Sequence, residues 1–323
     1  MRFPRTVLAL VLAAASLALA PSTWAWGCKG HQTIALIAEK HMSANAKALA
    51  QDLLSNNPMA FTLSCNDPGA GLMAAQSTWA DDERVKDSTR ITGGWHFFDI
   101  PRGAVQKTMD QFCNLQDSCV TQALRDQIAI LKDTTNPPAK RADALRFIIH
   151  FVGDEHQPLH NTTNNDRGAN CVPVKYFNDN TSASSTDPSA FTPNLHGVWD
   201  KDIIERDMGT RTVQQFADAL DANFSSQIAG WQAAGIDIDA WAWDSHQVAE
   251  DIAYGKLPKR LKIETLIYPP ITSCSQDNNV STRLKGKNIA LAQTYQDATV
   301  PVIEQRLEMA GIRLAMILNQ IAP

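Results

Sequence analysis

Two histidine–aspartate pairs constrain this chain more than any other feature of its sequence. His150 and Asp154 are four residues apart, as are His196 and Asp200, and His160 follows the first pair. At about 100° per residue, positions four apart lie only about 40° from each other around a helix, so both side chains can bind one ion. Imidazole and carboxylate groups are typical zinc ligands. The spacing therefore predicts a polynuclear zinc site.

The residues around the first pair predict a buried helix that ends at a proline. An apolar run, Phe147-Ile148-Ile149, adjoins the pair, and a carboxylate held near an apolar helix face requires a cation. Pro158 disfavours helical geometry at the residue before it, so the helix should end there and leave His160 turned toward a second ion. His156 lies about 240° around the helix from His150. We therefore expect His156 to face away from the metal.

The first 25 residues have the pattern of a secretory signal. Arg2 and Arg5 precede an apolar run from Val7 to Ala20, and Thr23 and Ala25 provide small residues before a cleavage point. The run is short for a transmembrane anchor, so no stable membrane association is expected. We predict cleavage after Ala25 and a secreted or periplasmic protein.

The charge of the mature chain argues against nonspecific nucleic-acid binding, and its cysteine content favours disulfides. Loss of Arg2 and Arg5 takes the formal charge from -5 to -7, which argues against nonspecific coating of nucleic acid but not against a metal site that binds phosphate. An even number of cysteines in an exported chain predicts disulfides. Cys113 and Cys119 are the expected local pair, and the pairing of Cys28, Cys65, Cys171 and Cys274 stays open.

The pattern of apolar residues predicts a single, compact, mainly helical (all-α) domain over residues 26–323, since no Pro- or Ser-rich linker divides it. We expect a monomer. The expected helices are one around Ile34, Ile37 and Ala38, one capped by Ser43, and Val120 to Leu131, Arg141 to Glu155, Val213 to Ile228 and Val302 to Ile321, with Pro301 beginning or kinking the last. The alternation of Val172, Val174 and Tyr176 predicts a small β-hairpin-like insertion in the loop from Asn161 to Asn194.

Cleavage after Ala25 would make Trp26 the new N-terminus, with His31 five residues on. A free α-amino group has a pKa near 7.7 to 8.0 and can lose its proton to a metal, while the neighbouring carbonyl oxygen completes a chelate ring. By position alone, a core tryptophan and a polar helix residue are the commoner explanation.

Five motifs occur in a fixed order along the chain: Trp26-Gly-Cys-Lys-Gly-His31, Trp79-Ala-Asp81 with Arg84, Trp95-His96-Phe97-Phe98-Asp99, His150-Phe-Val-Gly-Asp154 through Gln157-Pro-Leu-His160, and Asn194-Leu-His196-Gly-Val-Trp-Asp200. Together they resemble the secreted, zinc-dependent single-strand nuclease family of fungi, plants and bacteria. The resemblance covers nearly all of the mature chain. It implies a helical fold that zinc phospholipases C share.

The resemblance implies three zinc ions and a set of ligands for each. Asp81, His96, His150 and Asp154 would hold the first, His160, His196 and Asp200 the second, and Trp26 through its amino nitrogen and carbonyl oxygen, His31 and the bridging Asp154 the third. From the residues alone, Asp81 is more typical of an acidic surface turn, because Asp82 and Glu83 follow it, and His96 of a core histidine.

The resemblance also implies a substrate and a reaction. The substrate would be single-stranded DNA and RNA, together with 3′-mononucleotides, hydrolysed to products with 5′-phosphates. Arg84 would bind a phosphate oxygen, although a surface ion pair with Asp82 or Glu83 is the alternative. Phe97 would stack on a base, unless it is plain core packing, and Asp99 would accept a hydrogen bond from the base edge.

Two other functions remain open from the sequence. A zinc phospholipase C has a similar fold and a similar N-terminal tryptophan site, but it should lack a base-reading carboxylate such as Asp99. A non-catalytic zinc-binding protein should have closed tetrahedral sites, whereas a catalytic site keeps an open position.

Overall fold

The computed structural model describes residues 26–322, except 66–69, 87–90, 116–117, 184–190, 266, 268–270, 272 and 277–288. The predicted signal segment, residues 1–25, lies outside the described residues, so cleavage after Ala25 stays a prediction.

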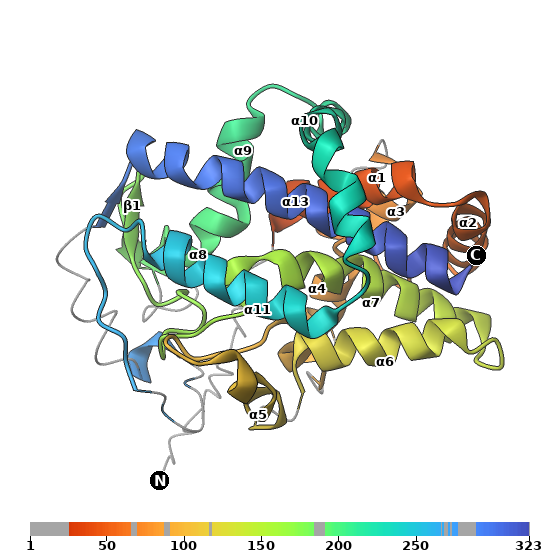
Figure 1. Ribbon diagram of the computed structural model, residues 1–323, viewed down its shortest axis with the longest axis horizontal. Helices are drawn as coiled ribbons and strands as arrows, with labels where there is room; N and C mark the ends of the chain where they lie inside the picture. Colours follow the sequence, from red (N-terminus) through yellow and green to blue (C-terminus); the bar gives the residue numbers. More distant parts are fainter. Residues whose placement is uncertain are drawn as a thin grey trace, which may run out of the picture.

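The described residues form a mainly helical fold, which confirms the predicted fold class (Figure 1). The longer helices are α1 (Gly27–His41), α2 (Ala44–Asn56), α4 (Trp79–Lys86), α6 (Val120–Lys132), α7 (Pro138–His156), α10 (Val213–Ala233), α11 (Ile238–Val248) and α13 (Gln293–Ile321). The shorter ones are α3 (Leu72–Gln76), η2 (Ile91–His96), η3 (Gln106–Thr108), α5 (Met109–Leu115), η4 (Pro158–His160), α8 (Leu195–Gly197), η5 (Val198–Asp202), α9 (Ile203–Met208), η6 (Ala249–Tyr254) and η7 (Cys274–Gln276).

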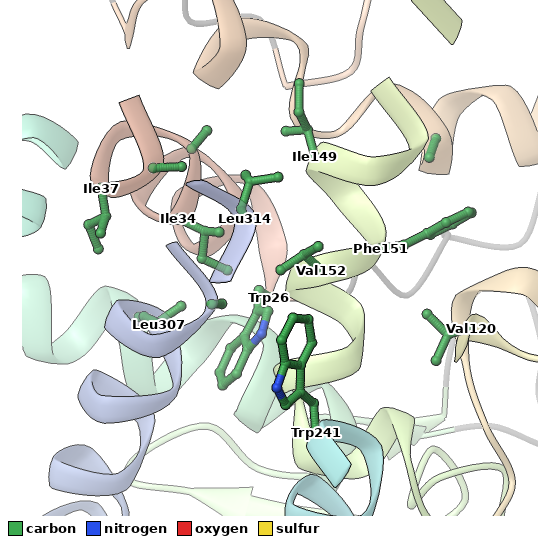
Figure 2. Packing of buried hydrophobic residues seen from close by; sticks show 14 of the residues in the cluster. Trp26, Ile34, Ile37, Val120, Ile149, Phe151, Val152, Trp241, Leu307 and Leu314 are labelled. Carbon is green, nitrogen blue, oxygen red and sulfur yellow. The ribbon is translucent and has the colours of Figure 1, made fainter. Parts of the chain in front are cut away.

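Helix α7 lies in the middle of this arrangement. It packs between α6 and α13, and α1 contacts α7, α10 and α13 (Figure 1). Figure 2 shows the indole of Trp26 between the ribbons of α7 and α13, and Trp26 belongs to the same cluster of buried apolar side chains as Ile149 and Leu314. Among the described helices, none has the length and apolarity needed to cross a bilayer.

Local sequence signals account for where these helices start and stop. The Ser43 hydroxyl accepts a hydrogen bond from the amide of Ala46 at 3.0 Å, which caps α2 as predicted. Thr212 and Gln215 form a capping box at the start of α10. Helix α7 ends at His156 because Gln157, the residue before Pro158, has extended geometry with ψ 114°.

Two predictions about secondary structure need correction. Helix α13 begins at Gln293, so Pro301 lies inside it and does not begin it. The strand β1 (Val174–Tyr176) pairs in parallel with β4 (Ile289–Leu291) rather than in a hairpin. An antiparallel pair does occur in the predicted loop, between β2 (Ser182–Ala183) and β3 (Phe191–Thr192).

Three disulfides join the six cysteines. The predicted local bond between Cys113 and Cys119 is confirmed. The other two bonds, which the sequence left open, are Cys28–Cys65 and Cys171–Cys274. Three disulfides without a free cysteine fit an extracellular protein.

Helices α1 and α13 approach each other closely at Gly311. A Cβ atom at Gly311 would lie 2.5 Å from Cγ2 and 2.6 Å from Cβ of Ile37, and 3.0 Å from the carbonyl oxygen of Ile34. Real Cβ contacts are longer, so the two helices can pack at this distance only because residue 311 has no side chain.

Gly311→Ala should therefore lower the free energy of unfolding by about 1 to 3 kcal/mol, the usual cost of overpacking. The measurement is urea unfolding followed by circular dichroism. Gly230→Ala is the matched control, because a Cβ at this exposed position of α10 meets nothing within 4 Å. It should raise the free energy of unfolding by about 0.5 to 1 kcal/mol through helix propensity. Equal effects of the two substitutions would contradict the close packing at Gly311.

Candidate metal centre

The first predicted pair lies on one face of α7. His150 and Asp154 are fully buried, and Nε2 of His150 lies 3.3 Å from Oδ2 of Asp154. His156 lies on another side of α7, where its Nδ1 donates to the carbonyl of Val152 and its Nε2 accepts from Arg313 at 2.7 Å. As predicted, His156 is not among the residues that converge on Asp154.

The two oxygens of Asp154 face different histidines. Oδ2 lies 3.0 Å from Nδ1 of His96 and 3.3 Å from Nε2 of His150. Oδ1 lies 3.4 Å from Nε2 of His31 on α1. One carboxylate thus stands between two sets of imidazole nitrogens, which is the geometry that a bridging ligand requires.

Asp81 adds a second carboxylate to the same cluster. It lies in the first turn of α4, with Oδ2 3.6 Å from Nε2 of His150 and Oδ1 3.7 Å from Nδ1 of His96. Arg84, one turn later on α4, pairs with Oδ1 of Asp81 at 3.0 Å. The alternative partner Asp82 instead accepts hydrogen bonds from Ser64, at 2.9 Å from its amide and 2.5 Å from its hydroxyl.

His31 reaches the cluster because α1 passes very close to α7. A Cβ at Gly153 would lie 2.7 Å from Nδ1 of His31, so only glycine fits there. The ring of His31 stacks on that of His150 with centroids 4.0 Å apart. Trp26, just before α1, donates its indole N–H to the carbonyl of Gly153 at 2.7 Å. Trp26 is thereby fixed beside the segment of α7 that carries Asp154.

The second predicted pair forms another group with His160. Nε2 of His196 lies 3.1 Å from Oδ2 of Asp200, and Nε2 of His160 lies 3.9 Å from Oδ1 of Asp200. Asp200 lies in a π-helical turn, η5, directly after the short helix α8 that carries His196. Gln157 donates to Oδ1 of Asp200 at 2.5 Å. The 3-10 turn η4, which begins at Pro158, brings His160 to the group, as predicted.

Backbone carbonyls orient three of the histidines. Nδ1 of His150 contacts the carbonyl of Ser77 at 2.8 Å, Nδ1 of His160 that of His96 at 2.6 Å, and Nδ1 of His196 that of Gly168 at 2.6 Å. A donor bond from Nδ1 leaves Nε2 as the lone-pair nitrogen, and such bonds are typical of metal-bound histidine. No sequence pattern indicates these partners, because a main-chain carbonyl can come from any residue.

Several side-chain atoms of the centre are buried and make no hydrogen bond to another described residue. They include Nδ1 and Nε2 of His31, Oδ2 of Asp81, Nε2 of His96, His150 and His160, Oδ1 of Asp154 and Oδ2 of Asp200. Buried polar atoms without partners are costly. Three groups of side chains place their ligand atoms within 4.8 Å of one another: His31, Asp81 and His150; His96, His150 and Asp154; and His160, His196 and Asp200. The predicted third set takes two of its donors from the backbone of Trp26, which these side-chain groups do not include, and its set of ligands stays a prediction.

The electrostatics of the cluster call for a cation. Burial lowers the pKa of His150, but the carboxylates of Asp154 and Asp81 outweigh this and raise it to about 9. Without metal, a proton on His150 thus partly balances the two carboxylates. Imidazole nitrogen and carboxylate oxygen are the donor set that zinc takes, so the residues present fit zinc ions in this place.

The residues predicted to bind a base lie near the second group, since the charge of His196 acts on Asp99. Phe97 and Asp99 are half-buried and lie one and three residues after His96 in the chain. Burial and the neighbouring carboxylate of Asp166 raise the pKa of Asp99 to about 7, whereas Arg167 and His196 lower it. Asp166 and Arg167 were not singled out from the sequence, since both lie in a polar loop without periodicity.

Comparison with known proteins identifies the family of this chain. A family model described as "S1/P1 Nuclease" matches residues 26–323. Nuclease S1 of Aspergillus oryzae is 27% identical, over 97% of each chain. Endonuclease 4 of Arabidopsis thaliana is 26% identical over 92% of this chain and 89% of its own. Nuclease P1 of Penicillium citrinum is 23% identical over 92% and 97%. The chain belongs to the S1/P1 nuclease family.

Proposed function

We propose that this protein is a secreted endonuclease that uses three zinc ions to hydrolyse single-stranded DNA and RNA, and also 3′-mononucleotides, to products with 5′-phosphates. The family is zinc-dependent, and its members include nucleases and endonucleases. The observation that carries the proposal is the buried carboxylate of Asp154, whose two oxygens face two different sets of histidine nitrogens.

The ligand set of the proposal follows these contacts. The first ion takes Asp81, His96, His150 and Asp154, and the second takes His160, His196 and Asp200. The third takes His31, Asp154 and the amino nitrogen and carbonyl oxygen of Trp26, which requires cleavage after Ala25. The stacking of His31 on His150 leaves Nε2 of His31 facing Asp154, which supports the third set.

The chain's own residues account for how a phosphodiester is bound and turned over. Zinc held by these ligands would supply charge neutralisation for the phosphate and would activate a water as the nucleophile near neutral pH. Asp154, whose two oxygens face different histidines, would be shared by two ions, and its burial would preorganise the groups that it holds. Arg84, held at the rim by Asp81 with 19% of its side chain exposed, presents a planar cation that suits a phosphate oxygen.

Preference for single strands follows from the depth of the centre. The ligands of the first group are fully or almost fully buried, and those of the second are only slightly exposed. A base must leave its stack to enter such a site, and an unpaired base avoids the few kcal/mol that unpairing costs. Phe97 would stack on the base and Asp99 would accept from its edge, which favours a nuclease over a phospholipase C.

Removal of zinc should destabilise the protein, because the buried carboxylates then lose their counter-charge. At free zinc a hundredfold above Kd, one bound ion contributes about 2.7 kcal/mol. Chelator-treated protein should therefore melt at least about 5 °C below zinc-loaded protein. Scanning calorimetry measures the difference, and equal melting temperatures would contradict a buried metal centre.

Asp154→Asn should lower kcat/KM on denatured DNA by more than about a hundredfold, since loss of even an outer contact to a metal ligand costs about 10- to 100-fold. Asp126→Asn, at an exposed site on α6, is the matched control and should leave activity unchanged. The assay compares denatured DNA, native duplex DNA and phosphatidylcholine micelles. Turnover of the lipid alone would support a phospholipase C, and no turnover of any of them a non-catalytic zinc-binding protein.

The base pocket should give nucleotide binding a pH dependence. Below its pKa of about 7, Asp99 holds a proton and loses its charge as an acceptor, so KM for a 3′-mononucleotide should rise as pH falls from 8 to 6. Asp99→Asn should raise KM at pH 8 and flatten this step while the zinc content stays the same. An unchanged KM at pH 8 in the variant would exclude Asp99 from the pocket.

A further inference from the structure

A second cluster of metal-binding side chain types lies at the other end of α1. His41 is the last residue of α1, Asp221 comes from α10 and Glu308 from α13, and their ligand atoms all lie within 4.8 Å of one another. His41 is ten residues beyond His31 on the same helix, which places it about 15 Å further along the axis. The cluster is therefore separate from the centre around Asp154.

Direct contacts already hold two of the three side chains together. Nε2 of His41 lies 2.6 Å from Oδ1 of Asp221. The main-chain carbonyl of His41 accepts a hydrogen bond from Asn319 at 3.0 Å. Lys40 is the nearby cation: its Nζ lies 2.9 Å from Oδ2 of Asp221 and 2.9 Å from Oδ1 of Asp218 on the same helix. The cluster thus holds its shape before any ion is bound.

Glu308 is the side chain that these contacts leave unexplained. The residue is fully buried, and within the described part of the chain neither of its carboxylate oxygens has a hydrogen-bond partner. The carboxylate of Asp221 lies close to that of Glu308, so two acidic groups face each other at this point. A buried carboxylate in this position needs either a proton or a cation between it and Asp221.

We propose that His41, Asp221 and Glu308 bind a further zinc ion that joins α1, α10 and α13. Imidazole nitrogen and carboxylate oxygen are both zinc ligands, and open zinc sites have three protein ligands with water in the fourth position. His41 and Asp221 are partly exposed, with about a fifth of each side chain open to solvent, so an ion can enter from the surface. Glu308 closes the site from the inside.

Lys40 has a defined role in this proposal as the competing cation. In the metal-free protein its ammonium group neutralises part of the charge on Asp221. When zinc binds, Lys40 keeps Asp218, its other partner, and the ion takes its place at Asp221. A divalent ion can contact all three ligands, whereas the Lys40 ammonium forms its ion pairs with Asp218 and Asp221.

Zinc stoichiometry tests the proposal. The mature protein, freed of metal and titrated with Zn²⁺, is passed over a desalting column and its bound zinc is measured by mass spectrometry. Glu308→Gln and His41→Gln should each hold one ion fewer than the wild type. Glu304→Gln is the matched control, because Glu304 lies one turn earlier on α13 beside Asp207, and it should hold the same number as the wild type.

A second variant tests the competition. Lys40→Met should tighten binding of this one ion by about fivefold, the scale of a partly exposed ion pair. Equal zinc counts in the wild type and both ligand variants, or an unchanged titration for Lys40→Met, would overturn the proposal. His41→Gln, at the solvent edge, keeps the test decisive if Glu308→Gln does not fold.

The result does not depend on the proposed nuclease activity. All four variants should cleave denatured DNA at the wild-type rate, since none alters the centre around Asp154. A missing nuclease activity together with a difference of one ion between wild type and Glu308→Gln would refute the proposed function alone.

Discussion

The burial of the Asp154 carboxylate is the interaction on which the rest of the structure depends. An ionised carboxylate in a protein interior costs several kcal/mol unless positive charge and hydrogen bonds surround it. Here three histidines from α1, η2 and α7 converge on it, and all three are fully buried. The packing of α1 and α4 against α7 can be understood as the means of bringing those partners to one point.

The sequence predicted the parts of this centre that are local. His150 with Asp154 and His196 with Asp200 were found because four-residue spacing on a helix places side chains together without knowledge of the fold. The turn that directs His160 was predicted from Pro158 alone. The sequence did not show that Asp200 lies in a π-helical turn, since that geometry depends on packing.

Features that join segments far apart in the chain were harder to predict from the sequence. Asp81 and His96 lie on short elements and became candidates only through the family resemblance, because an acidic run and a lone histidine usually have structural explanations. The parallel pairing of β1 with β4 and two of the three disulfides join segments far apart in the chain. His41, Asp221 and Glu308 come from three helices and share no spacing, so no local pattern could indicate them.

Helix α1 packs against two glycines, one on α7 and one on α13, where the missing side chains allow a close approach. Gly153 on α7 leaves room for the ring of His31, and Gly311 on α13 leaves room for Ile37, while Ile34 borders both gaps. The lateral position of an imidazole at the metal centre is thus set by two residues that offer no functional group of their own. Substitutions elsewhere in the α1–α13 interface can therefore alter the metal centre, because they would shift the whole of α1 and His31 with it.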